Sequence, residues 1–139
     1  MLALPHFDDA CIAAWTAYRE KMPKPKAIIA VSAHHIAGEN SIEVNATPKW
    51  NAWHDFRGFP SALYQIEYAA QGSPELAARV VQKLAAGRSQ IPVTLTQRDR
   101  MDHGVWGPLI HWLPERDVPI VTVALPADAG PRDFLAAGP

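Results

Sequence analysis

The sequence has only one cysteine, Cys11, so an internal disulfide framework is excluded and a reducing, cytoplasmic location is expected. It also lacks an excess of charge of either sign, because 13 Lys and Arg residues stand against 14 Asp and Glu residues. Proteins that grip a nucleic-acid backbone carry a basic surface, so no nucleic-acid partner is expected. No apolar run approaches the roughly 20 residues of a membrane-spanning helix, and no membrane partner is expected either.

Several common catalytic signatures are absent as well. There is no glycine-rich dinucleotide- or phosphate-binding loop, and no organic cofactor is predicted. The GxSxG nucleophile elbow, the HExxH zinc signature and the CxxC pair are also missing. Cys11 falls on an apolar helical face, which favours a buried, unreactive thiol over a nucleophile. The histidines are therefore the main candidates for chemistry.

The chain does contain the material for a folded core. Of its 139 residues, 48% are hydrophobic and 19% are charged, which is typical of one globular domain. We therefore expect residues 1–139 to form a single α/β domain. Thirteen prolines, spread along the whole sequence, predict many short elements. The first four residues are apolar with no preceding element to pack against, and the last predicted strand is not followed by the covering helix usual in an α/β sheet, so we expect the domain to be cut short at both ends.

Hydrophobic periodicity predicts an alternation of helices and strands. Helices are expected over residues 8–22, 73–87 and from about Pro108 to Leu113, and strands over 27–32, 41–44, 92–95 and 119–125. The runs at 27–32 and 119–125 are continuously apolar, so we expect adjacent, parallel, central strands that are buried on both faces. The stretch 48–60 has no clean period and is predicted to be a long ordered loop. The fold class is therefore α/β, with a central, mostly parallel sheet and helices on both faces.

His34 and His35 directly follow the first apolar run. Ligands and catalytic groups gather at the carboxyl ends of strands in parallel sheets, and a neutral imidazole can bind a transition metal there. The alternative interpretation is a pair of surface or capping histidines.

A second histidine lies in the aromatic-rich stretch 53–60, where His54, Asp55 and Arg57 fall within four residues beside Phe56. Such a loop can line a pocket for a planar substrate, since it offers ring faces, a cation and proton-transfer groups. The alternative is an aromatic loop that packs on the core, with His54 and Asp55 capping it.

A third neighbourhood is Asp102-His103-Gly104, followed by Trp106 and Gly107. A carboxylate beside a histidine can fix its tautomer, and glycine allows a backbone to approach a ligand closely. His103 is therefore a candidate general acid or base. The alternative is a tight turn before a helix.

Three segments together resemble the class III extradiol ring-cleavage dioxygenases, and within them the DOPA 4,5-dioxygenase-like branch. They are PKPKAIIAVSAHH, HDFRGFPSALYQIEYAAQGSPELAARVVQKL and DHGVWGPLIHWLPERDVPIVTVAL, in the family's order over roughly residues 12–125. The resemblance implies an incomplete version of the extradiol dioxygenase fold. It also implies a non-haem Fe(II) cofactor, often replaced by zinc, and a catechol-type substrate whose ring is opened with O₂.

The resemblance further implies roles for individual residues. His34 matches the metal-binding histidine of the family's SAHW motif, in which His35 replaces the tryptophan. His54 matches the pocket histidine of the HDFGGFP loop, in which Arg57 replaces a glycine or small residue. His103 matches the acid/base histidine of the DHG motif, and His103 and His54 are the residues expected to be catalytic. The other residues expected to line the substrate pocket are His35, Asp55, Phe56, Asp102 and Trp106.

The resemblance accounts for only one metal ligand, His34, whereas a ferrous site normally has three protein ligands. We therefore expect weak or absent turnover from this chain alone, unless another chain contributes ligands, and we expect self-association. Two functions remain as alternatives to an extradiol dioxygenase: a scaffold or interaction domain that has lost the metal, and a metal-dependent hydrolase. Catechol-dependent O₂ uptake would separate the oxygenase from the hydrolase.

Overall fold

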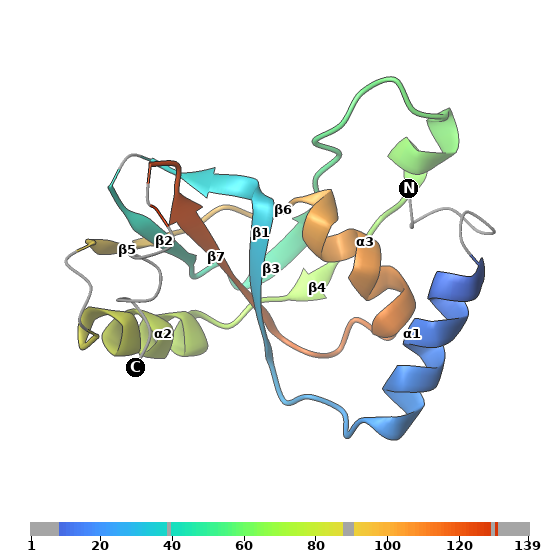
Figure 1. Cartoon of the computed structure of the whole chain (residues 1–139), viewed down its shortest axis with the longest axis horizontal. Helices are drawn as coiled ribbons and strands as arrows, with labels where there is room; N and C mark the ends of the chain where they lie inside the picture. Colours follow the sequence, from blue (N-terminus) through green and yellow to red (C-terminus); the bar gives the residue numbers. More distant parts are fainter. Residues whose placement is uncertain (1–8, 39, 88–90, 129, 131–139) are drawn as a thin grey trace.

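The computed structural model describes residues 9–38, 40–87, 91–128 and 130 (Figure 1). In chain order the elements are α1 (Asp9–Lys21), β1 (Ile28–Ala37), β2 (Ile42–Asn45), β3 (Lys49–Ala52), the 3₁₀ helix η1 (Ser61–Gln65), β4 (Ala70–Gln71), α2 (Pro74–Ala85), β5 (Val93–Thr96), β6 (Arg100–Met101), α3 (His103–Trp112) and β7 (Ile120–Pro126). None of the described helices is long and apolar enough to cross a membrane. The predicted α/β class is confirmed, although residue 8 of the first predicted helix lies outside the described residues.

The main sheet has four strands in the order β1-β7-β2-β5. β1 runs parallel to β7, with Ile28 opposite Ile120, and β2 runs parallel to β5. β2 and β7 are antiparallel, so two of the three pairings in this sheet are parallel. The prediction that residues 27–32 and 119–125 form adjacent parallel strands is confirmed.

Helices cover both faces of this sheet, and β7 separates two hydrophobic clusters. Ile120 packs with Trp50 and Trp106 on the face of α3. Val121 and Val123 point the other way, into the cluster that includes Ala77 of α2. Because successive side chains of a strand alternate between faces, one short strand contributes to both cores.

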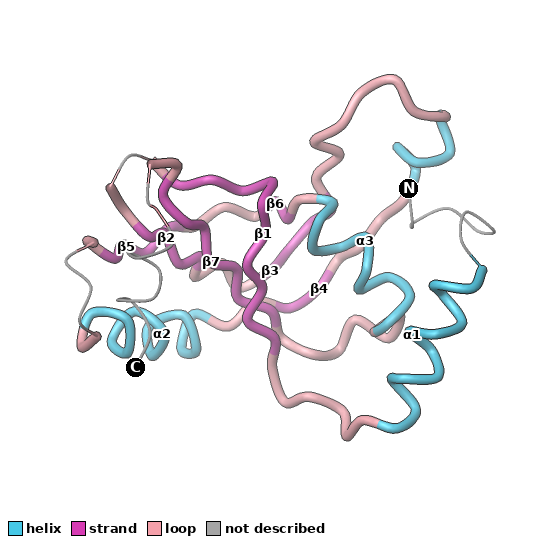
Figure 2. Tube along the Cα trace, in the orientation of Figure 1, coloured by secondary structure: helices cyan, strands magenta, loops and turns pink. Residues whose placement is uncertain are grey.

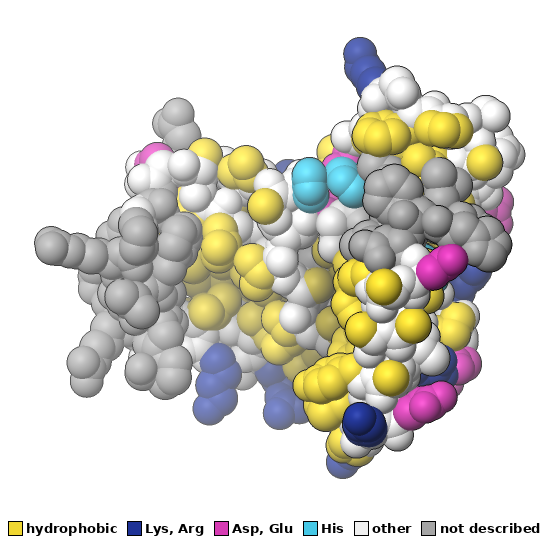
Figure 3. Space-filling model, turned by 45° about the vertical axis from the view of Figure 1, so that its right-hand side comes forward, with side chains coloured by type: hydrophobic (Ala, Val, Ile, Leu, Met, Phe, Trp, Pro, Cys, Tyr) yellow, Lys and Arg dark blue, Asp and Glu magenta, His cyan; other side chains and the backbone are white. Residues whose placement is uncertain are grey.

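The expected burial of β1 on both faces is wrong. β1 lies at the edge of the sheet, and Ile29 and Val31 are 54% and 58% exposed. They line an apolar groove of about 510 Å³ with Leu76, Val80 and other residues of α2, β2 and β7. Figure 3 shows apolar side chains gathered in a hollow on one face of the molecule. A continuous apolar run indicates that a strand can be buried on both faces. Whether it is buried depends on other elements of the fold packing against both faces.

The stretch 48–60 is not entirely a loop. Its first part is β3, which pairs antiparallel with β4 and parallel with β6. Trp50 of β3 is fully buried, and its indole N–H donates to the carbonyl of Ile120 at 2.9 Å. Only the following residues form the predicted loop, which Figure 2 shows leading from β3 to η1.

The helix predicted from about Pro108 begins earlier, at His103. Asp102 is its N-cap and accepts a hydrogen bond from the backbone N–H of Gly104 at 3.0 Å. An Asp in this position stabilises the first turn, and the proline then falls inside the helix instead of opening it. His103 is consequently the first residue of α3.

The two other helices follow their predicted ranges closely. Ser73 caps α2 by accepting a hydrogen bond from the backbone N–H of Leu76 at 3.1 Å, and Pro74 takes the first helical position. α1 has no buried residue, so the expected burial of Cys11 is wrong: its side chain is partly exposed. The helix lies on α3, as Figure 1 shows.

Candidate metal and acid–base site

His34 lies inside β1, not after it. The pairing register between β1 and β7 shifts between Val31 and Ile36, so His34 occupies an irregular part of the strand. Such irregularities re-aim side chains and are frequent beside functional sites. The His34 side chain is half-exposed. Figure 3 shows histidine side chains at the molecular surface, beside apolar ones.

A hydrogen-bonded network ties the start of α3 to β1. Oδ1 of Asp102 accepts from the Ser32 hydroxyl at 2.6 Å, and Ser32 Oγ accepts from the backbone N–H of His34 at 3.2 Å. Gly104 allows this approach, since a Cβ there would lie 2.7 Å from Ser32 Oγ and 2.9 Å from Cδ2 of His34. As a result, the rings of His34 and His103 lie only 4.1 Å apart, centroid to centroid.

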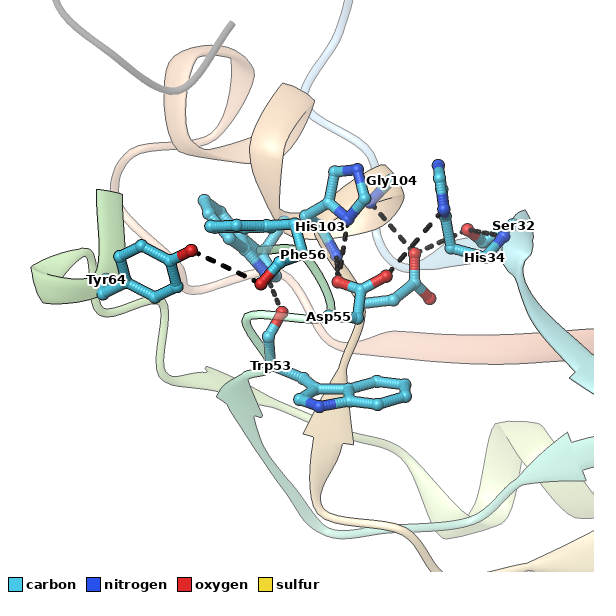
Figure 4. Close-up of polar contacts among 10 residues, drawn as sticks. Ser32, His34, Trp53, Asp55, Phe56, Tyr64, His103 and Gly104 are labelled. Carbon is cyan, nitrogen blue, oxygen red and sulfur yellow. Dashed lines mark hydrogen bonds and ion pairs between the residues drawn. The ribbon is translucent and has the colours of Figure 1, made fainter. Parts of the chain in front are cut away.

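Asp55 reaches both histidines from the loop after β3 (Figure 4). Its Oδ1 accepts from the backbone N–H of His103 at 3.0 Å and lies 2.8 Å from Nδ1 of that ring. Its Oδ2 lies 3.9 Å from Nδ1 of His34. Burial alone would raise the pKa of Asp55, but the two hydrogen bonds from His103 outweigh it and lower that pKa. Asp55 is therefore a carboxylate at neutral pH.

These three residues have the composition of a metal site. His34, Asp55 and His103 each offer a ligand atom, and those atoms lie within 4.8 Å of one another. Two imidazoles and one carboxylate form the donor set of many non-haem ferrous sites, and the same donors bind zinc. The cluster therefore fits a first-row divalent metal ion in its chemistry.

His54 lies one aromatic ring away from this cluster. The Phe56 ring lies perpendicular to both imidazole rings, with centroid distances of 5.7 Å to His54 and 5.4 Å to His103. Nε2 of His54 lies 3.0 Å from the carbonyl oxygen of Ile66, which holds the ring on the η1 side of Phe56. Trp106 is fully buried behind these rings, and its indole N–H donates to the Trp53 carbonyl at 2.9 Å.

His35 is separated from its neighbour His34. Its Nε2 lies 3.0 Å from Nη1 of Arg98, and it lines a hollow of about 360 Å³ that also includes Trp53, Arg100 and Asp102. Burial, followed by the positive charge of Arg98, lowers the pKa of His35. Asp102 is 2% exposed, and Arg57 is exposed to solvent.

Sequence reasoning missed one residue of this region, Ser32. It is half-buried, and its hydroxyl links the N-cap Asp102 to the backbone of His34. Its position two residues before His34 in a strand was the available signal, because side chains two apart share a face in a regular strand.

The region that contains these residues matches a known family. Residues 10–134 match the family described as "Catalytic LigB subunit of aromatic ring-opening dioxygenase". The chain belongs to the LigB family.

Curated relatives carry names that agree with this membership. The LigB-family chain is 40% identical over 119 residues to "4,5-DOPA dioxygenase extradiol" of Escherichia coli K12, covering 85% of this chain and 42% of the relative. It is 43% identical over 110 residues to the protein of the same name from Beta vulgaris, covering 78% of this chain and 40% of the relative. The chain thus spans about two fifths of the length of these relatives.

A solved structure supports the fold. The crystal structure of an uncharacterized protein from Escherichia coli K12 matches the LigB-family chain with a TM-score of 0.63 and 34% identity. The match covers 85% of this chain and 41% of that one. The architecture is therefore that of a LigB-family protein, and the chain belongs to a family of ring-cleaving dioxygenases.

Proposed function

We propose that this chain carries active-site residues of an extradiol dioxygenase that opens a catechol-type ring with O₂ at non-haem Fe(II). The observation that carries the proposal is the pair of rings of His34 and His103, 4.1 Å apart beside the buried carboxylate of Asp55. These residues stand in the segments that match the family, and the relatives bear extradiol dioxygenase names.

Each residue has a distinct part in this proposal. His34 would hold the ferrous ion, which when bound supplies the centre at which a catechol and O₂ are activated. Nδ1 of His103 lies 2.8 Å from Asp55 Oδ1, so Nε2 is the atom that would take a proton from a catechol hydroxyl and later return it. His54 and the aromatic rings packed around it, Phe56 among them, would border the pocket that orients a planar substrate.

The proposal assigns His103 to proton transfer and Asp55 to the orientation of His103, so His34 is the one residue of the cluster that it makes a metal ligand. The site then needs further ligands, because ferrous dioxygenase sites use three protein ligands. The chain spans about two fifths of the relatives' length. We propose that the remaining ligands come from outside the residues described, or from another chain. Turnover by this chain alone is therefore expected to be weak or absent.

The test combines metal binding with O₂ consumption. The chain is titrated with Zn(II), and with Fe(II) under anaerobic conditions. Catechol-dependent O₂ uptake by the Fe(II)-loaded chain is then measured in aerated buffer at high protein concentration. His34→Ala is expected to lower metal affinity because a ligand is lost. His103→Ala is expected to leave metal binding nearly intact and to abolish any O₂ uptake. His111→Gln is the matched control, since this histidine is also on α3, about 12 Å along the axis from His103.

The outcomes separate the alternatives. A chain that binds no metal in the micromolar range, with His34→Ala unchanged, would favour the scaffold or interaction domain. Metal-dependent hydrolysis of esters or amides without catechol-dependent O₂ uptake would favour the hydrolase.

A further inference from the structure

One oxygen of the Asp55 carboxylate, Oδ1, serves a single residue, His103. The backbone N–H and the ring Nδ1 of His103 both lie within hydrogen-bond distance of the same oxygen, Oδ1, at 3.0 and 2.8 Å. The Asp55 side chain is only 8% exposed, so water competes poorly for this oxygen. A carboxylate can only accept, and therefore Nδ1 of His103 carries a proton.

Asp102, the acidic neighbour of His103 in sequence, has a different task. Its Oδ1 already accepts from the Ser32 hydroxyl and from the backbone N–H of Gly104. It is thus the N-cap of α3 and the link to β1. The two aspartates therefore differ in function: Asp102 caps α3 and links it to β1, and Asp55 orients the imidazole of His103.

The ring of His103 is held from three sides. Asp55 fixes Nδ1, the ring of Phe56 packs at 90° to it, and the His34 ring lies tilted by 47° at 4.1 Å. Nδ1 of His34 also faces Asp55, at 3.9 Å. In Figure 4 the other ring nitrogen of each histidine points away from Asp55, toward the same side. Both Nε2 atoms are therefore presented together.

We propose that Asp55 is a positioning residue that locks His103 in the Nδ1-protonated tautomer and fixes Nε2 beside Nε2 of His34. The inference rests on the proposed function in one respect: Nε2 of His103 is then the atom that exchanges protons with substrate, and Nε2 of His34 is the atom that faces the metal. A carboxylate that orients a histidine through its second ring nitrogen is a common arrangement at metal and acid–base sites.

The first experiment needs no activity. The tautomer of each histidine ring is read from long-range ¹H–¹⁵N correlation spectra of the chain labelled with ¹⁵N-histidine. The spectra are recorded in alkaline buffer, because tautomers are defined for the neutral ring. His103 is expected to show a protonated Nδ1 and a bare Nε2. Asp55→Ala should move most of the population to the Nε2-protonated form, which predominates in free imidazole side chains. A bare Nδ1 in the unaltered chain, or no change in Asp55→Ala, would overturn the proposal.

Asp102→Asn is the matched control. It removes the charge of the neighbouring acid but keeps a good N-cap residue, so the tautomer of His103 is expected to stay as it is. If Asp55→Ala fails to fold, Asp55→Asn retains the size of the side chain, and the spectrum of the unaltered chain still decides the tautomer. A tautomer change in Asp102→Asn as large as that in Asp55→Ala would contradict this difference in function between the two aspartates.

Zn(II) titration separates positioning from metal ligation. Asp55→Asn is expected to weaken zinc binding by about 10- to 100-fold at most, whereas His34→Ala removes the ligand itself and loses more. A loss in Asp55→Asn that equals the loss in His34→Ala would make Asp55 a ligand and overturn the proposal. A chain that binds no zinc at all would count against the proposed function, while the tautomer measurement would still test Asp55.

Discussion

Tyr68 is the residue whose ionisation should most affect stability at high pH. It is 1% exposed, its hydroxyl donates to the carbonyl of Leu113 at 3.1 Å, and burial raises its pKa to about 12. In the unfolded chain this phenol titrates near pH 10. Between pH 10 and 12 the unfolded state therefore binds fewer protons, and the free energy of unfolding falls as pH rises, by roughly 2–3 kcal/mol from this group.

Tyr68→Phe removes both the hydrogen bond and the titration. At pH 7 the variant should lose about 1 kcal/mol of unfolding free energy with the hydrogen bond. Between pH 10 and 12 it should lose less stability than the unaltered chain does. Urea unfolding at pH 7 and pH 11 measures both effects, and equal losses in the two proteins would contradict the prediction.

Gly104 controls the contact between α3 and β1. Gly104→Ala would place a Cβ 2.7 Å from Ser32 Oγ, so either the hydroxyl or the helix must shift. We expect a loss of about 1–3 kcal/mol in urea unfolding and a displaced His34 resonance. Gly107→Ala on the same helix is the control. Nothing lies within 4 Å of a Cβ there, and alanine favours helix, so its stability should be unchanged or higher.

At the scale of elements, the sequence predicted those that carry a local cap or a continuous apolar run, and it missed a short strand that has neither. α2 follows from its capping Ser73 and its periodicity, and the pairing of β1 with β7 follows from two apolar runs. β3 was missed because a four-residue strand owes its existence to β4 and β6, whose sequences say nothing of the pairing. The start of α3 had a readable signal, the N-cap Asp102.

The site shows the same division. The histidines of the motifs were identified as candidates, and the contact of His34 with His103 joins two of them. The partner of His103 was sought at its neighbour Asp102. The structure gives that contact to Asp55, which is 48 residues away along the chain. The local sequence cannot show which of the two carboxylates contacts the His103 ring, because folding brings the distant one, Asp55, next to it.

Ser73→Ala tests the local rule directly. The variant leaves the N–H of Leu76 without its side-chain acceptor. Loss of this cap should lower the free energy of unfolding by about 1 kcal/mol. Ser61→Ala is the control, because Ser61 opens η1 without a side-chain capping bond. Equal effects in the two variants, measured by urea unfolding, would contradict the assignment of Ser73 as a cap.

At the scale of the whole molecule, the exposed side of β1 favours association between chains. Ile29, Val31 and Ile36 are each more than half exposed on an edge strand, and an edge strand of this kind readily pairs with another. We expect the chain to sediment above its monomer mass at micromolar concentration. Ile29→Lys should shift it toward monomer, since lysine on an edge opposes pairing.

Met22→Lys is the control for that experiment. Met22 is 45% exposed but lies just after α1, away from the sheet, so the same charge there should leave association unchanged. A purely monomeric unaltered chain in sedimentation equilibrium would contradict the expectation.

β7 contributes to both hydrophobic clusters and pairs on both of its edges. Neither core can open without stripping one side of this strand, so the two halves of the molecule share a single cooperative unit instead of forming two foldons. Its amides should be the last to exchange with deuterated solvent, and they should do so only when the whole chain unfolds. His34 lies on β1, which pairs with β7, so the arrangement of the histidines should persist until β7 unfolds.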